Sequence, residues 1–402
     1  MRIATATAYQ TTIQNLQDRQ VDLTDAQVRL TSGKRVLRAS DDPTAAARAE
    51  RALATTERAT VSQRAVESSR TAMTLAESAL GDAVGLLQAA RESLVAAGNG
   101  SYTAAERQGL AQQLQQYRDQ LLSIANRQDG AGNYLFSGQG ASGMPFINTP
   151  GGVQFTGIGG AVSVASGEVL PATVDGQTAW MSAATGNGVF ETQRTAANGA
   201  AWIDAGRVTD PAQVQGLRYD VTFSVAAGVT TYSVQPRDPG TGVAVGAPTT
   251  GPYTSGAAIA IDGISFNISG TPANGDEFRI LPSEPSLSVF ETLDRAIAGL
   301  RNGNAIPAEV VQTTTDGLRN IDSVLGRLQS VRSAVGDTLN RIDGVEDRLS
   351  STKLAAQVDR SNAEDLDMVQ AISDFQNKQT GYDAVLKTYG TVQRMSLFQY
   401  LG

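Results

Sequence analysis

The sequence predicts a multidomain α + β protein, in which long antiparallel helical rods formed by both ends of the chain enclose an inserted, mostly antiparallel β domain. Two observations carry this prediction. Residues 1–138 and 287–402 place apolar side chains three and four positions apart, the spacing of packed or coiled-coil helices. Between them, residues 139–286 are rich in Gly, Thr, Val and Pro, and apolar side chains alternate with polar ones.

The helix breaks divide this chain into three predicted domains. A terminal helical assembly domain comprises residues 1–40 and 361–402, a helical rod domain comprises residues 41–138 and 287–360, and a β-rich domain comprises residues 139–286.

The first helix ends early, at Gly33, which suits the position after a helix C-terminus. Asp42 and Pro43 then fit the N-cap and first position of a new helix, because Pro lacks only an N–H group that would be unpaired there. An Asp41–Asp42 catalytic or metal-binding pair is the alternative interpretation, and a helix start is the simpler one.

From Pro43 the helical pattern continues to about Ala97, where Gly98, Asn99 and Gly100 interrupt it. A shorter helix follows and is predicted to end near Gln128. Long helices joined by a short turn pack side by side in antiparallel orientation.

The C-terminal arm repeats this plan. A short helix over residues 287–302 precedes a long one that Pro307 opens. Ser361-x-x-Glu364 matches a capping box, which predicts that a fresh final helix starts there. The internal glycines of the long helix indicate either close helix approach or local softness, and the sequence does not decide between them. These glycines are Gly317, Gly326, Gly336 and Gly344.

In the middle of the chain, residues 219–225 and 259–266 alternate as strands do. Asp262-Gly263 lies between alternating apolar residues, which predicts a type I′ hairpin turn, and Asn274-Gly275 predicts another turn.

Composition argues against most catalytic and nucleic-acid functions. The chain has neither His nor Cys, and its net charge is −8, so we expect no metal, no cofactor, no enzyme activity and no nucleic-acid partner. Gly138-x-Gly140-x-x-Gly143 matches a dinucleotide-binding pattern, but β-like sequence follows it instead of a helix. No apolar run is long enough for membrane insertion, and we expect no cleaved signal peptide.

The two terminal helices, residues 1–32 and 365–401, have too little apolar surface to form a core alone. We therefore expect neighbouring copies to cover their apolar stripes, whereas the rod helices pack within one subunit. The predicted subunit contacts are Ile13, Leu16, Leu23, Leu30, Leu366, Val369, Ile372, Tyr382, Leu386, Tyr389 and Leu397.

The ends of the chain resemble the flagellin superfamily. RLTSGKRVLRASDDPTAA at residues 29–46 resembles its N-terminal signature, and AEDLDMVQAISDFQNKQTGYDAVLKTYGTVQRMSLFQYL at 363–401 resembles its C-terminal segment. Within that superfamily, NYLFSGQ at 133–139, PF at 145–146 and GGVQFTG at 151–157 resemble the hook-associated proteins of the hook–filament junction. The resemblance covers residues 1–160 and 287–402.

This resemblance implies a structural subunit of the bacterial flagellum, which joins hook to filament through coiled-coil packing of its terminal helices. The implied partners are copies of itself, a neighbouring hook-associated junction protein, flagellin and a cytoplasmic export chaperone. It also implies an extracellular location, reached unfolded through the flagellar type III export apparatus.

Two alternatives stay open. A filament flagellin would share the helical arms and differ in copy number and position. A secreted adhesin or effector would bind a ligand through its β domain, and that function favours a concave aromatic patch. Trp180 and Trp202, the only two tryptophans, both lie in loop-like sequence.

Overall fold

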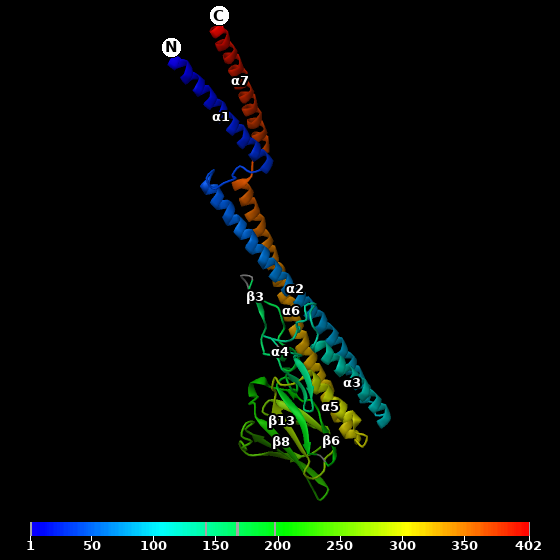
Figure 1. Ribbon diagram of the computed structural model, residues 1–402. Helices are drawn as coiled ribbons and strands as arrows, with labels where there is room; N and C mark the ends of the chain where they lie inside the picture. Colours follow the sequence, from blue (N-terminus) through cyan, green and yellow to red (C-terminus); the bar gives the residue numbers. More distant parts are fainter. Residues whose placement is uncertain (1, 141–142, 166–168, 197, 402) are drawn as a thin grey trace. The chain divides into compact units, whose positions relative to one another are not determined.

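The computed structural model describes the backbone of residues 2–140, 143–165, 169–196 and 198–401, and the side chains of 10–140, 143–163, 169–196 and 198–391. The predicted fold class is confirmed, since helices form both ends of the chain and antiparallel strands form the middle (Figure 1). The helices are α1 (Arg2–Ser32), α2 (Pro43–Ala97), α3 (Ala104–Ala125), α4 (Gly176–Trp180), α5 (Val289–Arg301), α6 (Pro307–Glu364) and α7 (Met368–Leu401). The chain forms two compact units, one of residues 1–64 and 346–402 and the other of residues 65–345. The three-domain division at residues 40, 138, 286 and 360 stays a prediction.

Helices α1 and α2 have the predicted limits, but α3 ends three residues before the predicted Gln128. The helix ends at Asn126. The side-chain amide of Asn126 forms two hydrogen bonds with the backbone of Phe146, the first residue of β1, and so holds the helix end beside that strand. At the other end, Thr103 and Glu106 form a capping box, with the Thr103 hydroxyl accepting from the Glu106 N–H group and the Glu106 carboxylate accepting from the Thr103 N–H group. Sequence reasoning could have found this box from its T-x-x-E pattern.

The rod core of the larger unit consists of apolar residues from α2, α3, α5 and α6. Its fully buried leucines include Leu80, Leu87, Leu94, Leu114 and Leu121, all with 0% exposure. Ion pairs along the surface, such as Arg91 Nε to Asp322 Oδ1 at 2.7 Å, lie outside this core. The apolar stripes predicted for the rod helices are therefore internal to one subunit.

The glycines inside α6 are of two kinds. A Cβ atom on Gly317 would overlap the Leu94 side chain, so this glycine allows α6 to approach α2 closely. Around Gly326 and Gly336, by contrast, a Cβ atom would meet no atom within 4 Å. Close approach of α2 therefore explains Gly317. For Gly326 and Gly336 the remaining interpretation is that glycine locally lowers the stability of the helix.

The predicted helix start at Ser361 is wrong, because α6 continues without a break to Glu364. Ser361 sits inside the helix and its hydroxyl bonds to the Asp365 carboxylate. The cap of α7 is Asp367, whose Oδ1 accepts from the N–H groups of Val369 and Gln370.

The inserted domain is built around two antiparallel sheets. One has the strand order β10-β9-β8-β13-β5, and the other has the order β11-β12-β6 with β7 also paired to β12. Its strands are β5 (Phe190–Ala196), β6 (Ala200–Ile203), β7 (Arg207–Val208), β8 (Arg218–Ala226), β9 (Val229–Arg237), β10 (Thr249–Pro252), β11 (Ala258–Ile261), β12 (Ile264–Thr271) and β13 (Glu277–Pro282). Apolar residues from both sheets, among them Phe223, Phe266 and Phe278, form one buried cluster. Two small hairpins precede it, formed by β1 (Phe146–Thr149) with β2 (Gly152–Phe155), and by β3 (Ser163–Ala165) with β4 (Val169–Pro171).

The predicted hairpin turn at Asp262-Gly263 is confirmed. Ile261 pairs with Ile264, and Asp262 and Gly263 have φ angles of 43° and 76°. Two consecutive positive φ angles are the signature of a type I′ turn.

Neither tryptophan lies in a loop, so that part of the sequence interpretation is wrong. Trp180 ends α4, is fully buried, and stacks on Phe290 with ring centroids 5.9 Å apart. Trp202 belongs to β6 and pairs with Ser269 of β12. Packing against the distant Phe290 places Trp180, and pairing of β6 with β12 places Trp202, and the local sequence reveals neither partner.

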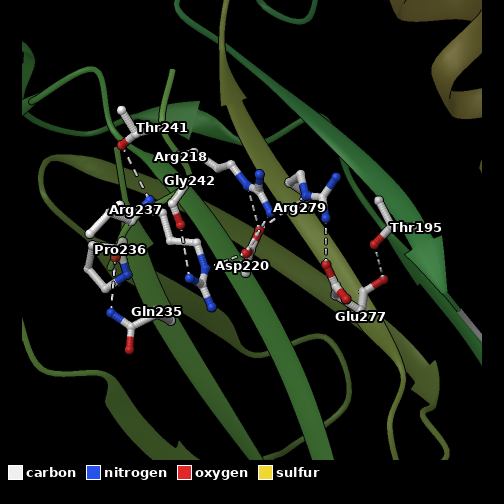
Figure 2. A network of polar contacts seen from close by, with 11 residues as sticks. Thr195, Arg218, Asp220, Gln235, Pro236, Arg237, Thr241, Gly242, Glu277 and Arg279 are labelled. Carbon is white, nitrogen blue, oxygen red and sulfur yellow. Dashed lines mark hydrogen bonds and ion pairs between the residues drawn. The ribbon is translucent and has the colours of Figure 1, made fainter. Parts of the chain in front are cut away.

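A charged network lies on the face of the larger sheet opposite its core. Asp220 of β8 accepts hydrogen bonds from Arg218 and Arg279, and Arg237 of β9 forms an ion pair with it at 2.7 Å (Figure 2). Burial acts to raise the pKa of the Asp220 carboxyl, but the hydrogen bonds from Arg218 and Arg279 outweigh it and hold the pKa below its ordinary value. These contacts link the adjacent strands β9, β8 and β13 through their side chains.

Polar side chains of α6 attach the inserted domain to the rod. Gln312 accepts from the Ile203 N–H group at 2.9 Å, Arg319 donates to the Thr192 hydroxyl at 2.8 Å, and Arg327 donates to a carbonyl of α4 at 2.8 Å. One face of α6 thus satisfies backbone groups and side chains of the inserted segment.

Candidate assembly surface

The last residues of α1 and the first residues of α7 lie at a joint where both arms of the chain break. Gly33 ends α1 with a φ angle of 68°, a left-handed conformation that favours glycine. Its carbonyl accepts from the Leu366 N–H group at 2.9 Å, and the Arg35 N–H group donates to the Glu364 carbonyl at 2.7 Å. The break before α2 and the break before α7 therefore form one hydrogen-bonded structure.

Charged side chains reinforce this joint. Lys34 Nζ lies 3.2 Å from one carboxylate oxygen of Glu364, and Arg360 Nε lies 2.7 Å from the other. Arg35 reaches across to the Ala363 carbonyl at 2.8 Å. The Lys34 and Arg35 contacts link the N-terminal arm with the end of α6. The Arg360 contact holds the Glu364 carboxylate in position for Lys34.

Asp41 and Asp42 shape the start of α2. Oδ2 of Asp41 accepts from the N–H groups of Leu37 and Arg38, and Oδ1 of Asp42 accepts from the Ala45 N–H group at 3.0 Å. The predicted N-cap at Asp42 is therefore confirmed. The backbone hydrogen bond from Ala45, helped by the Thr44 hydroxyl and the Arg35 guanidinium, lowers the pKa of Asp42 to about 2.

Beyond the joint, α1 and α7 pack against each other as an antiparallel pair, with both chain termini at the same end (Figure 1). A Cβ atom added to Gly381 would lie 2.8 Å from Nη1 of Arg19, so the Arg19 side chain passes directly over this glycine. The contact fixes which levels of the two helices lie beside each other.

The predicted contact residues divide into two groups in this pair. Half-buried side chains are those of Ile13, Leu16, Leu23, Leu30, Leu366, Tyr382 and Tyr389. Exposed side chains are those of Val369 (82%), Ile372 (45%) and Leu386 (40%). Leu397 belongs to α7, and its side chain lies outside the described residues.

Sequence reasoning missed two exposed apolar residues of α1, Val21 (59%) and Val28 (45%). They are seven residues apart and share a stripe with Gln14, opposite the half-buried residues. Their spacing of seven residues could have revealed them. Leu16, Leu23 and Leu30 have the same spacing and a stronger apolar character, so the prediction used those three residues alone. Apolar side chains are thus exposed on both helices of the pair.

The described part of the chain offers no candidate metal site beside this surface. Among those residues, no group of three or more Asp or Glu side chains is arranged to hold a metal ion. The described helices include none that is long and apolar enough to cross a membrane. After the glycine-rich stretch, β1 follows where a phosphate-binding loop would need a helix.

Comparison with known proteins identifies both ends of the chain. Residues 3–141 match the bacterial flagellin N-terminal helical region, and residues 318–401 match the bacterial flagellin C-terminal helical region. Flagellar hook-associated protein 3 of Salmonella typhimurium strain LT2 is 27% identical over 333 residues, which are 81% of this chain and 76% of that protein.

Solved structures extend the similarity to three dimensions. The crystal structure of flagellar hook-associated protein 3 from Legionella pneumophila superposes with a TM-score of 0.69 at 28% identity, over 77% of this chain and 97% of that one. The FlgL crystal structure from Xanthomonas campestris gives 0.68 at 28% identity, over 78% and 99% of the two chains. Matched at both ends by flagellin helical regions, the chain belongs to the flagellin superfamily and is similar to flagellar hook-associated protein 3.

Proposed function

We propose that this protein is a structural subunit of the bacterial flagellum that joins the hook to the filament, several copies packing together through their terminal helices. The observation that carries the proposal is the α1–α7 pair, which ends at a hydrogen-bonded joint with the start of α2 and the end of α6 and leaves apolar side chains uncovered. The similarity to hook-associated protein 3 over most of the chain supports a place for this surface in the flagellum.

The uncovered residues favour assembly over a stable free monomer. Val369 and Val21 expose 82% and 59% of their surface in a segment that has only one partner helix. Each large aliphatic side chain that a neighbouring copy covers adds on the order of 1 kcal/mol. Copies that cover each other's stripes would therefore be stabilised cooperatively, and Ile13, Leu16, Leu23, Leu30, Leu366, Tyr382, Tyr389 and Leu397 would support or extend those contacts.

The other partners follow from the same role. A neighbouring hook-associated junction protein would contact one end of the assembled ring and flagellin the other. The subunit would leave the cell unfolded through the flagellar type III export apparatus, and a cytoplasmic chaperone would cover the α7 stripe before export. A chain without Cys suits this route, because no disulfide has to form or break along it.

Immunogold electron microscopy with antibody to the sheet domain, residues 190–282, tests the proposal. Intact flagella should carry a narrow band of label at the boundary between hook and filament. Label along the whole filament would make the protein a filament flagellin. Flagella without label, combined with protein free in the medium, would instead favour a secreted adhesin or effector.

A further inference from the structure

An arginine cluster lies on the outer face of the larger sheet, opposite the buried apolar cluster of the inserted domain. It consists of Arg218 of β8, Arg237 of β9 and Arg279 of β13, which all point towards Asp220 (Figure 2). They are three of the five arginines in residues 190–282, a segment that has no lysine. One carboxylate therefore gathers most of the positive charge of the inserted domain in one place.

The arginine cluster exposes its positive charge and hides its negative charge. The Asp220 side chain is 9% exposed, whereas the three arginine side chains are between 22% and 36% exposed. Glu277 accepts a hydrogen bond from Arg279 at 2.9 Å, so three guanidinium groups face two carboxylates and one positive charge is left over. An approaching ligand therefore meets guanidinium groups before it meets Asp220.

Each arginine of the cluster has one terminal nitrogen without an acceptor among the described residues. Arg218 donates from Nε and Nη2 to Asp220, at 2.8 Å each. Arg237 pairs with the same carboxylate through Nε at 2.7 Å and donates from Nη1 to the Gly242 carbonyl at 3.0 Å. Arg279 uses Nε and Nη2 on the two carboxylates. These bonds already hold the side chains in place, so an anion that accepts from the three free nitrogens restricts them little further.

The side chains around the arginine cluster indicate which class of ligand fits. The residues beside it in strand register are polar, namely Gln193, Thr222, Ser233 and Gln235. Interfaces with other proteins have an apolar centre, and nucleic-acid sites use many phosphate contacts or aromatic rings that stack on bases. Hydroxyl and amide groups beside guanidinium groups instead match a carbohydrate that carries acidic groups, because such a ligand offers both hydroxyls and oxyanions to hydrogen-bond.

The spacing of the arginines favours a chain of acidic groups over a single small anion. Strands β9, β8 and β13 are adjacent, and neighbouring strands lie about 4.8 Å apart, so the cluster extends over about 10 Å. We propose that the arginine cluster binds an acidic polysaccharide, whose oxyanion groups pair with Arg218, Arg237 and Arg279. At 0.1 M salt the Debye length is about 10 Å, so the ligand is attracted by the cluster more than it is repelled by distant acidic groups of a chain with a net charge of −8.

Fluorescence anisotropy of labelled dextran sulfate, titrated with the purified full-length protein at 0.1 M ionic strength, tests the proposal. Labelled neutral dextran of the same length shows whether charge is needed, and competition by inorganic sulfate at equal ionic strength shows whether a chain is needed. The test variant is Arg237→Gln, because Arg218 and Arg279 still pair with Asp220 after this change. The matched control is Arg207→Gln, which removes an exposed arginine of β7 from the other sheet of the same domain.

The protein should bind dextran sulfate and not neutral dextran. Arg237→Gln should raise the Kd about threefold, and Arg237→Gln combined with Arg279→Gln about tenfold, whereas Arg207→Gln should change it by less than about twofold. Thermal unfolding of each variant shows that all are folded at the temperature of the titration.

Three results would overturn the proposal. An arginine cluster that serves only to hold strands together would lower the unfolding midpoint of the variants and leave the Kd unchanged. Equal binding of the two dextrans, or an equal loss with Arg207→Gln, would remove the role of this face. Full displacement by inorganic sulfate would make it a site for small anions. Because the titration uses purified protein, none of these results depends on a place at the hook–filament junction.

Discussion

The rod core and the terminal pair are both made of long antiparallel helices, yet they bury their apolar residues to very different extents. Leu80, Leu87 and Leu94 of α2 are completely inaccessible to solvent, because α2 packs among other helices of the rod. In the terminal pair, Leu16 and Leu23 are only half-buried, and Val21 and Val28 are exposed. A helix with a single neighbour can cover one stripe and no more.

The rod core buries its leucines within one subunit, whereas the terminal pair leaves apolar side chains exposed. Under the proposed function, neighbouring copies would cover those side chains. The joint at residues 33–42 and 364–367 is the boundary between these two regimes, and its hydrogen bonds keep both terminal helices in one register.

Leu87→Ala should have the largest effect on stability. Removing a fully buried leucine leaves a cavity in the rod, and the free energy of unfolding should fall by about 2–5 kcal/mol. Urea denaturation of the purified subunit measures this loss. Leu354→Ala is the control, since that leucine is 63% exposed and should change stability by less than about 0.5 kcal/mol. Equal losses in the two variants would mean that the rod core is not where the subunit's stability lies.

Substitution of two glycines of α6 compares a closely packed position of the rod with an open one. Gly317→Ala would press a methyl group into Leu94 and should destabilise the subunit by about 1–3 kcal/mol. Gly326→Ala meets open space and should stabilise it by roughly 0.5–1 kcal/mol, because alanine favours a helix. Thermal unfolding of both variants tests the assignment, and a loss of stability in Gly326→Ala would contradict it.

The sequence predicted helix positions better than it predicted contacts. Asp42-Pro43, Gly33 and Asp262-Gly263 act on backbone within a few residues of themselves, so their structural roles could be read locally, and all three are confirmed. Ser361 failed as a cap because its capping-box pattern also occurs inside a helix, where Ser361 bonds to Asp365 instead. The burial of Trp180 and the close approach at Gly317 depend on partners more than a hundred and two hundred residues away, respectively.

The same limit applies to the candidate surface. A heptad identifies an apolar stripe but does not say which helix covers it. Leu23 and Val28 both fit heptads, and only the position of α7 shows that Leu23 is half-buried while Val28 is exposed.

Leu23→Asp and Val28→Asp test the difference between the half-buried and the exposed stripe of α1. Leu23→Asp places a carboxylate on the half-buried seam, so protection of α7 against hydrogen exchange should fall by about 1–2 kcal/mol. Val28→Asp adds a charge to an exposed position and should change that protection by less than about 0.5 kcal/mol. Both variants should fail to restore motility to cells lacking the protein. Normal motility with Val28→Asp would show that the outward stripe makes no essential contact.

The smallest expected effect concerns the joint, where the pKa of Asp42 lies at about 2, below the ordinary value of 3.8. A carboxyl whose pKa is lower in the folded state stabilises that state above the ordinary value, and the contribution is lost as the pH falls towards 2. Carbon-detected NMR of the Asp42 carboxyl should therefore show a midpoint near 2. Arg35→Ala removes one of the groups that lower the pKa and should raise the midpoint, whereas Arg38→Ala, which leaves the three hydrogen-bond partners of Asp42 in place, should shift it less. An Asp42 that titrates at its ordinary value would mean that the α2 cap is open in solution.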